Sequence, residues 1–197
     1  MKKIAGILLL ITTICFSACQ KFSVAPGTEP TVMKKVPINS ATPSLKQNTD
    51  TVAAVNGYLQ LKLAKDSVNT DGVLVRFSPD SKTIYVRGED APTMQGFGQV
   101  SLSSFSSDNV PLAINVLPLS SQGLTIALKV AARNDGQYTL NLQSISSVPD
   151  YYNIVLRDTY KKDSVDLRSS PSYAFSIANA DTTSFGANRF KLVIRQK

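Results

Sequence analysis

The sequence predicts an all-β fold: an antiparallel β-sandwich, Ig-like or jelly-roll-like, of about ten short strands. Apolar and polar residues alternate with a period of two from residue 55 onward, turn residues separate the alternating runs, and no window of this region shows a helical stripe. Because successive side chains of a strand point to opposite faces, each run is expected to bury one face and expose the other. A closed barrel is the alternative that the same pattern leaves open.

The alternating runs follow one another along the whole second part of the chain. The run 112–117 is bracketed by Pro111 and Pro118, which is where proline is tolerated at the ends of strands. In the other runs, the positions expected to face the core are Leu59, Leu61 and Leu63; Val73, Val75 and Phe77; Leu124, Ile126, Leu128 and Val130; Tyr138, Leu140 and Leu142; Tyr173, Phe175 and Ile177; and Phe190, Leu192 and Ile194.

Turn-forming residues mark the boundaries between these runs. Asn134-Asp135-Gly136 lies between two alternating segments and is the strongest local signal for a tight hairpin. Further turns are predicted at Thr70-Asp71-Gly72, Ser78-Pro79-Asp80, Asn179-Ala180-Asp181 and Gly186-Ala187-Asn188.

The N-terminus has a different organisation. Two lysines follow Met1, the run 4–14 is apolar, and the small residues Ser17 and Ala18 lead into Cys19. This order resembles a bacterial lipoprotein signal peptide with its lipobox. The resemblance implies that residues 1–18 are removed by cleavage between Ala18 and Cys19, and that the Cys19 thiol carries a diacylglyceryl group. An uncleaved anchor is the alternative, although a membrane-spanning helix needs about 20 apolar residues.

Residues 19–51 are expected to be the lipidated cysteine and a flexible tether, and residues 52–197 the β-sandwich domain. The tether segment has no hydrophobic period and contains four prolines, so it buries too little apolar surface to offset the entropy of ordering. Once Cys15 is removed with the signal peptide, Cys19 is the sole remaining cysteine, which excludes an internal disulfide.

Composition limits the chemistry. The chain contains no histidine, which excludes Ser-His-Asp and Cys-His catalysis and every metal site that needs an imidazole. We therefore predict no cofactor and no metal. Residues from 52 onward include 15 basic and 12 acidic residues, scattered along the sequence, so nucleic acid is not an expected partner.

Four short motifs in the second half of the chain resemble those of a known type of module. In order, they are Leu156-x-Asp158, Asp166-Leu167, Tyr173-x-Phe175 and Arg189-Phe190-x-Leu192. Together they resemble the β-sandwich module near the C-terminus of large proteins secreted by the type IX route, over roughly residues 68–195. The resemblance implies an accessory module with structural rather than catalytic motifs. From the residues themselves, we expect the Asp158 carboxylate to accept backbone N–H groups of the following turn, and Phe190 to face inward.

Four hydroxyl residues each follow an aspartate: Thr51, Ser67, Ser164 and Thr182. These positions resemble the acceptor motif for periplasmic O-glycosylation in the same bacterial group. All four are expected in the tether or in turns, where a transferase has access. The alternative is that Asp-Ser and Asp-Thr are common turn formers.

Two functions remain. The preferred one is a membrane-anchored, non-catalytic envelope lipoprotein that acts as an accessory or interaction module and binds protein or glycan. Its candidate patch residues are Tyr85, Tyr151, Tyr152 and Tyr160, which alternatively fill or flank the core.

The alternative function is a carboxylate-dependent carbohydrate-active enzyme, which needs two carboxyl groups across a cleft. Glu89 and Asp90 are adjacent, so on an extended chain they are expected to point apart.

The expected location is the cell envelope. Gln20 rather than aspartate follows the anchor cysteine, and residues 20–28 contain no acidic residue. For a lipoprotein of this kind, these features favour the outer membrane, facing the periplasm rather than the cell surface.

Overall fold

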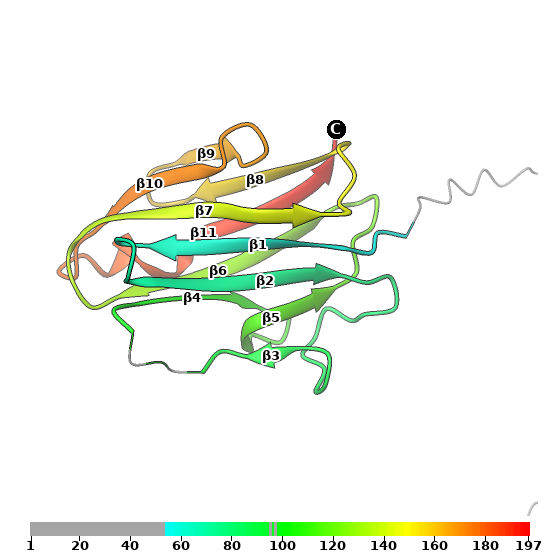
Figure 1. The fold of residues 1–197 in the computed structure, drawn as a ribbon, viewed down its shortest axis with the longest axis horizontal. Helices are drawn as coiled ribbons and strands as arrows, with labels where there is room; N and C mark the ends of the chain where they lie inside the picture. Colours follow the sequence, from blue (N-terminus) through cyan, green and yellow to red (C-terminus); the bar gives the residue numbers. More distant parts are fainter. Residues whose placement is uncertain (1–53, 95, 97) are drawn as a thin grey trace, which may run out of the picture. The chain divides into compact units, whose positions relative to one another are not determined.

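Eleven β-strands and one short 3-10 helix make up the part of the chain that the computed structural model describes, residues 54–94, 96 and 98–197 (Figure 1). The predicted signal peptide, Cys19 and the tether lie outside these residues. The elements are β1 (Gly57–Ala64), β2 (Thr70–Phe77), β3 (Ala91–Pro92), β4 (Val100–Phe105), β5 (Pro111–Leu117), β6 (Leu124–Ala132), β7 (Gly136–Ser146), β8 (Tyr152–Asp158), β9 (Asp163–Asp166), β10 (Ser172–Ile177), η1 (Thr182–Ser184) and β11 (Gly186–Gln196).

The strands are hydrogen-bonded in the order β10-β7-β1-β2-β5-β4-β6-β11-β8-β9, with β3 paired to β5. This sheet folds over on itself into two layers: in Figure 1, β7, β1 and β2 lie in front, and β6, β11 and β8 lie behind. The pairing is antiparallel except between β2 and β5, which are parallel. The prediction of an all-β sandwich is confirmed, with this one parallel pair as the exception to antiparallel pairing.

Strand β5 connects the two layers. Its first residues, Pro111 and Leu112, pair with β4, and the stretch from Ile114 to Leu117 then pairs with β2. A buried polar group supports this crossover, because the Asn115 side-chain amide donates hydrogen bonds to Ser104 Oγ and to the Phe105 carbonyl, each at 3.2 Å. The amide thus binds β5 to β4 beyond the point where their backbone ladder ends.

The core lies between the layers and consists of the residues that the alternation predicted. Leu59, Val75, Leu128 and Leu192 are fully buried, and nearly all the other predicted inward positions are also buried. Leu124 and Leu142 are only half-buried and pack against the core from its margin.

Three predicted turns differ in the structure. The segment 134–136 is not a hairpin, because β6 pairs with β4 and β11 whereas β7 pairs with β1 and β10; the segment instead carries the chain from one layer to the other. The segment 70–72 begins β2, and the turn before it is organised by Asp66, whose Oδ1 accepts the N–H groups of Val68 and Asn69.

The third predicted turn that differs, residues 186–188, changes which side chains enter the core. The segment 186–188 belongs to β11, where the register against β6 shifts between Gly186 and Phe190. Such a bulge adds residues to one strand and re-aims its side chains. As a result, the neighbouring residues Arg189 and Phe190 are both buried, at 1% and 0% exposure.

Candidate functional site

A fully buried ion pair joins the last strand to β8. Arg189 Nη2 lies 2.8 Å from Asp158 Oδ2, and Nε lies 3.1 Å from Oδ1, with neither side chain exposed to solvent. Asp158 ends β8 and Arg189 enters the interior through the bulge in β11. A forked guanidinium on a carboxylate is the strongest common form of side-chain hydrogen bonding, and it fixes both groups in one geometry.

Backbone carbonyls and aromatic rings surround the rest of the guanidinium. Arg189 Nη1 donates to the carbonyl of Ser176 at 2.7 Å and to that of Ser184. Its Cζ lies 4.7–4.8 Å from the ring centroids of Tyr160, Phe175 and Phe190. The cation is therefore enclosed by aromatic faces and carbonyl oxygens, and its side chain is fully shielded from solvent.

Asp158 likewise has its acceptors occupied, as the sequence predicted. Its Oδ1 accepts the backbone N–H groups of Tyr160 at 3.0 Å and Lys161 at 3.2 Å, and Tyr173 Oη donates to its Oδ2 at 3.2 Å. Burial alone would raise the pKa of Asp158, but the hydrogen bonds from Arg189 and the Lys161 N–H outweigh it and lower that pKa. The carboxylate is therefore held ionised, which suits a structural role and not that of a general acid.

The second buried carboxylate, Asp90, is satisfied by backbone groups alone. Its Oδ1 accepts the N–H of Val116 at 2.8 Å, and its Oδ2 accepts the N–H of Val86 at 2.7 Å. Glu89 beside it is exposed. The two adjacent acids therefore have different surroundings and do not face each other across a cleft. Within residues 54–94, 96 and 98–197 there is no group of three or more acidic or cysteine side chains that could hold a metal ion.

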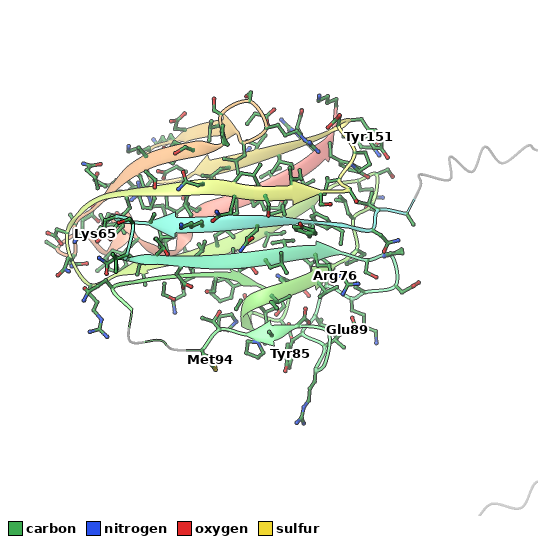
Figure 2. All side chains as sticks on the ribbon, viewed as in Figure 1. Lys65, Arg76, Tyr85, Glu89, Met94 and Tyr151 are labelled. Atoms are coloured by element: carbon green, nitrogen blue, oxygen red, sulfur yellow. The ribbon has the colours of Figure 1, made fainter. Side chains whose placement is uncertain are left out.

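The four tyrosines proposed for a binding patch do not form one. Tyr152 is fully buried, and its hydroxyl donates to the Ser120 carbonyl at 3.3 Å. The ring of Tyr160 covers Arg189. Tyr151 lies in the loop before β8, and Figure 2 shows it at the upper right of the domain, whereas Tyr85 lies in the lower part, near β3. The sequence did not separate these roles, because tyrosine is equally suited to a core margin and to a binding surface.

A different tyrosine lines a groove on the outer face of β1 and β2. Tyr58 is 39% exposed and lies directly opposite Arg76 in the β1–β2 ladder (Figure 2 labels Arg76). The groove has a volume of about 340 Å³. We call it the outer-face groove; its lining residues are Asn56, Gly57, Tyr58, Leu74, Arg76, Phe77, Ser146 and Ser147.

Local backbone geometry shapes the end of this groove. A Cβ on Gly57 would lie 2.6 Å from the carbonyl oxygens of Ser146 and Ser147, so this close approach of β1 to the end of β7 requires glycine. Ser147 itself has a φ of 55°, a left-handed conformation that is uncommon outside glycine and asparagine. Its hydroxyl lies 3.5 Å from that of Ser146, so two hydroxyl groups border the groove.

The groove combines an exposed aromatic ring, a guanidinium, a side-chain amide and two hydroxyls over a partly apolar floor. A flat ring beside planar and hydroxylic hydrogen-bonding groups suits a ligand with apolar faces and many hydroxyls, such as a sugar. One feature of the sequence indicates this site. Tyr58 and Leu74 are apolar residues at positions that the alternation assigns to the solvent-exposed face.

The candidate glycosylation residues are all accessible where the structure describes them. Ser67 is exposed in the turn between β1 and β2, and Thr182 is exposed at the start of η1. Ser164 is exposed too, but it lies on strand β9 rather than in a turn. Thr51 is outside the described residues, as are Ala18 and Cys19.

Within the described part of the chain, no helix has the length and apolar character needed to span a membrane. Comparison with protein-family models gave no match, and comparisons with curated proteins and with solved structures gave none either.

Proposed function

We propose that this protein is a membrane-anchored, non-catalytic envelope lipoprotein whose β-sandwich is an interaction module. The observation that carries the non-catalytic role is the state of the two buried carboxylates. Asp90 has both oxygens bound to backbone N–H groups, and Asp158 is bound by Arg189 and by backbone N–H groups. Neither has a free oxygen positioned to transfer a proton to a substrate.

The anchor rests on the N-terminal residues. The basic n-region, the short apolar run and the sequence Ser17-Ala18-Cys19 support cleavage before Cys19 and acylation of its thiol. Gln20 and the lack of acidic residues over 20–28 support an outer-membrane location on the periplasmic side. Two or three acyl chains on one cysteine make attachment durable, since a single chain gives only marginal binding.

The surface that we assign to the interaction is the outer-face groove. Tyr58 offers a ring on which a sugar can stack, and Arg76 opposite it offers several donors in a fixed plane. A glycan of the envelope, or a glycosylated protein, is therefore the ligand class that the groove fits best. No described carboxylate lines the groove, which accords with binding rather than hydrolysis.

Modification is the remaining part of the proposal. Ser67, Ser164 and Thr182 are exposed and follow aspartates, so they are proposed acceptors for O-glycosylation together with Thr51. The intact mass of the native protein tests this directly. A mass equal to that of the lipidated polypeptide alone would contradict it.

Two cysteine variants test the anchor. Cells are grown with a labelled fatty acid, and the label on the Cys19→Ala protein is compared with that on Cys15→Ala. We expect Cys19→Ala to lose the label and Cys15→Ala to keep it, because Cys15 is removed with the signal peptide. Label absent from the unchanged protein, or lost equally from both variants, would contradict the proposal.

A further inference from the structure

Four basic side chains share the outer face of the rear layer. Residues that alternate with the buried positions of β6, β11 and β8 point away from the core. Four of them are charged and exposed, and we call them the basic face: Lys129, Arg157, Lys191 and Arg195.

The cations of the basic face are not ion-paired within the described part of the chain. The exposed acid beside the face is Asp108, between Ser107 and Asn109, which line a hollow with Thr125 and Ala127. None of its four residues belongs to an ion pair with any residue that the structure describes; the two ion pairs found there are Arg168–Asp150 and Arg189–Asp158. The acidic residue nearest to the face in the strand ladder is Asp166 of β9, which pairs with Val155. Asp166 is half-buried, and its Oδ1 accepts the N–H of Arg168 at 2.9 Å.

The arrangement is unfavourable for the isolated fold. Arg157 and Lys191 lie directly opposite each other in the β8–β11 ladder. Like charges at such positions repel and lower the stability of a sheet. The uncharged positions between the cations are small or apolar: Thr125, Ala127, Val155 and Val193. The cations are therefore spread over a floor of small and apolar residues, hollowed where Thr125 and Ala127 line a space of about 370 Å³, and folding alone does not account for them.

We infer that the basic face is a docking surface for an anionic lipid bilayer. Strands lie about 4.8 Å apart and rise about 3.3 Å per residue, so the four charges, spread over three neighbouring strands, cover an area roughly 10 Å by 20 Å. Widely spaced cations complement many headgroups at once, whereas a single small anion needs convergent donors. The inference rests on the proposed lipid anchor in one respect: the anchor keeps the domain close to a bilayer. The binding of headgroups depends on the charges of the basic face itself.

Docking by this face would also orient the outer-face groove. The groove lies on the outer side of β1 and β2, and the basic face lies on the outer side of β6, β11 and β8. Figure 1 shows the first two strands in the front layer and the other three in the rear layer. With the rear layer against the headgroups, Tyr58 and Arg76 point away from the membrane. The groove is then presented to ligands in the surrounding compartment rather than to lipid.

Vesicle co-sedimentation tests the docking without the anchor. The protein is the chain from residue 19 with Cys19→Ser, which contains the entire compact unit from Asn48 to Lys197. It is mixed with neutral phosphatidylcholine vesicles or with vesicles that also contain phosphatidylglycerol. We expect binding to the anionic vesicles only, and binding that weakens as salt rises, because surface charges are screened beyond the Debye length.

Two double variants with equal charge change separate this face from the overall charge. Lys191→Ser/Arg195→Ser removes two cations of the basic face, and Lys62→Ser/Lys65→Ser removes two from β1 and the turn after it, in the opposite layer. Each basic residue near a membrane surface is worth about a fivefold change in binding. We therefore expect the first variant to lose binding roughly 25-fold and the second to lose much less. Circular dichroism of both variants confirms that the fold is intact.

Three results would overturn the inference. One is an equal loss in the two double variants, and another is equal binding to neutral and anionic vesicles. The third is tighter binding to a soluble acidic polysaccharide than to anionic vesicles with the same dependence on Lys191 and Arg195, which would assign the face to a glycan. None of these results bears on acylation of Cys19, which the fatty-acid label tests separately.

Discussion

The carboxylate of Asp71 on β2 accepts the backbone N–H of Leu102 on β4, with Oδ2 and N 2.8 Å apart. The two strands belong to different layers, and β4 pairs with β6 on its other side. Asp71 Oδ1 also accepts the N–H of Gly72 at 2.8 Å. A single side chain therefore satisfies an amide at the open edge of β4 and ties the front layer to the rear layer.

Replacement of Asp71 by alanine is expected to destabilise the domain. The change leaves the Leu102 N–H without its acceptor, and an unsatisfied amide costs about 1–3 kcal/mol. Urea unfolding of Asp71→Ala measures the loss. Asp80→Ala is the matched control, because Asp80 is exposed in the turn after β2. Equal stabilities for the two variants would mean that the tie between layers contributes nothing.

Removal of Arg189 is expected to have a larger effect. Arg189→Met leaves the buried carboxylate of Asp158 without its partner, and breaking a buried pair from one side costs about 3–5 kcal/mol. Arg157→Met, on the exposed face of β8, is the control and should change the free energy of unfolding little. If Arg189→Met does not fold, Asp158→Asn/Arg189→Met should recover part of the stability, since it removes the uncompensated charge. No recovery would contradict this account.

Tyr173 makes stability dependent on alkaline pH. Burial, together with the nearby Asp158 and Asp163 carboxylates, raises the pKa of Tyr173 above its ordinary value. A pKa raised in the folded state gives stability that is fully present below the unfolded pKa, about 10, and is lost above it. Wild-type stability should therefore fall more steeply above pH 10 than that of Tyr173→Phe. Below that pH the two proteins should differ by a constant offset; parallel curves throughout would refute the assignment.

The outer-face groove predicts which surface residues matter for binding. Tyr58→Ala and Arg76→Ala should each recover less of an envelope ligand than the unchanged protein does, because each variant removes a group that contacts the ligand, the ring in one and the guanidinium in the other. Truncating a dominant residue at the centre of a binding site costs about 2 kcal/mol or more, which is roughly thirtyfold in affinity. Ile84→Ala, at an exposed residue outside the groove, is the control. Quantitative pull-down from native envelopes measures all three, and equal recovery would exclude the groove.

Much of this fold follows from the period-two alternation, and the exceptions have physical reasons. Strand β4 carries serines at positions that are buried beside Asn115, so its apolar pattern is weak. β2 and β5 pair although they are far apart in the sequence, and no residue pattern in either strand indicates that they are partners. The Asn134–Gly136 turn has ideal hairpin residues, but the pairing of its flanking strands is decided by the layers.

The candidate sites were predicted less completely. Asp158 was expected to accept the N–H groups of its turn, and the structure confirms this. Its contact with Arg189 depends on the bulge in β11, which local sequence does not specify. The outer-face groove joins residues near positions 57, 76 and 147, and only the strand register brings them together.

The position of the last strand constrains how the chain matures. β11 is an interior strand, hydrogen-bonded to β6 on one side and β8 on the other. A nascent polypeptide that ends before residue 186 lacks this strand. In its absence β6 and β8 have no shared neighbour, and the apolar side chains on their inner faces remain exposed to solvent. Closure of the rear layer must therefore wait for synthesis of residues 186–196, so the domain completes its fold only after nearly all of it has been made.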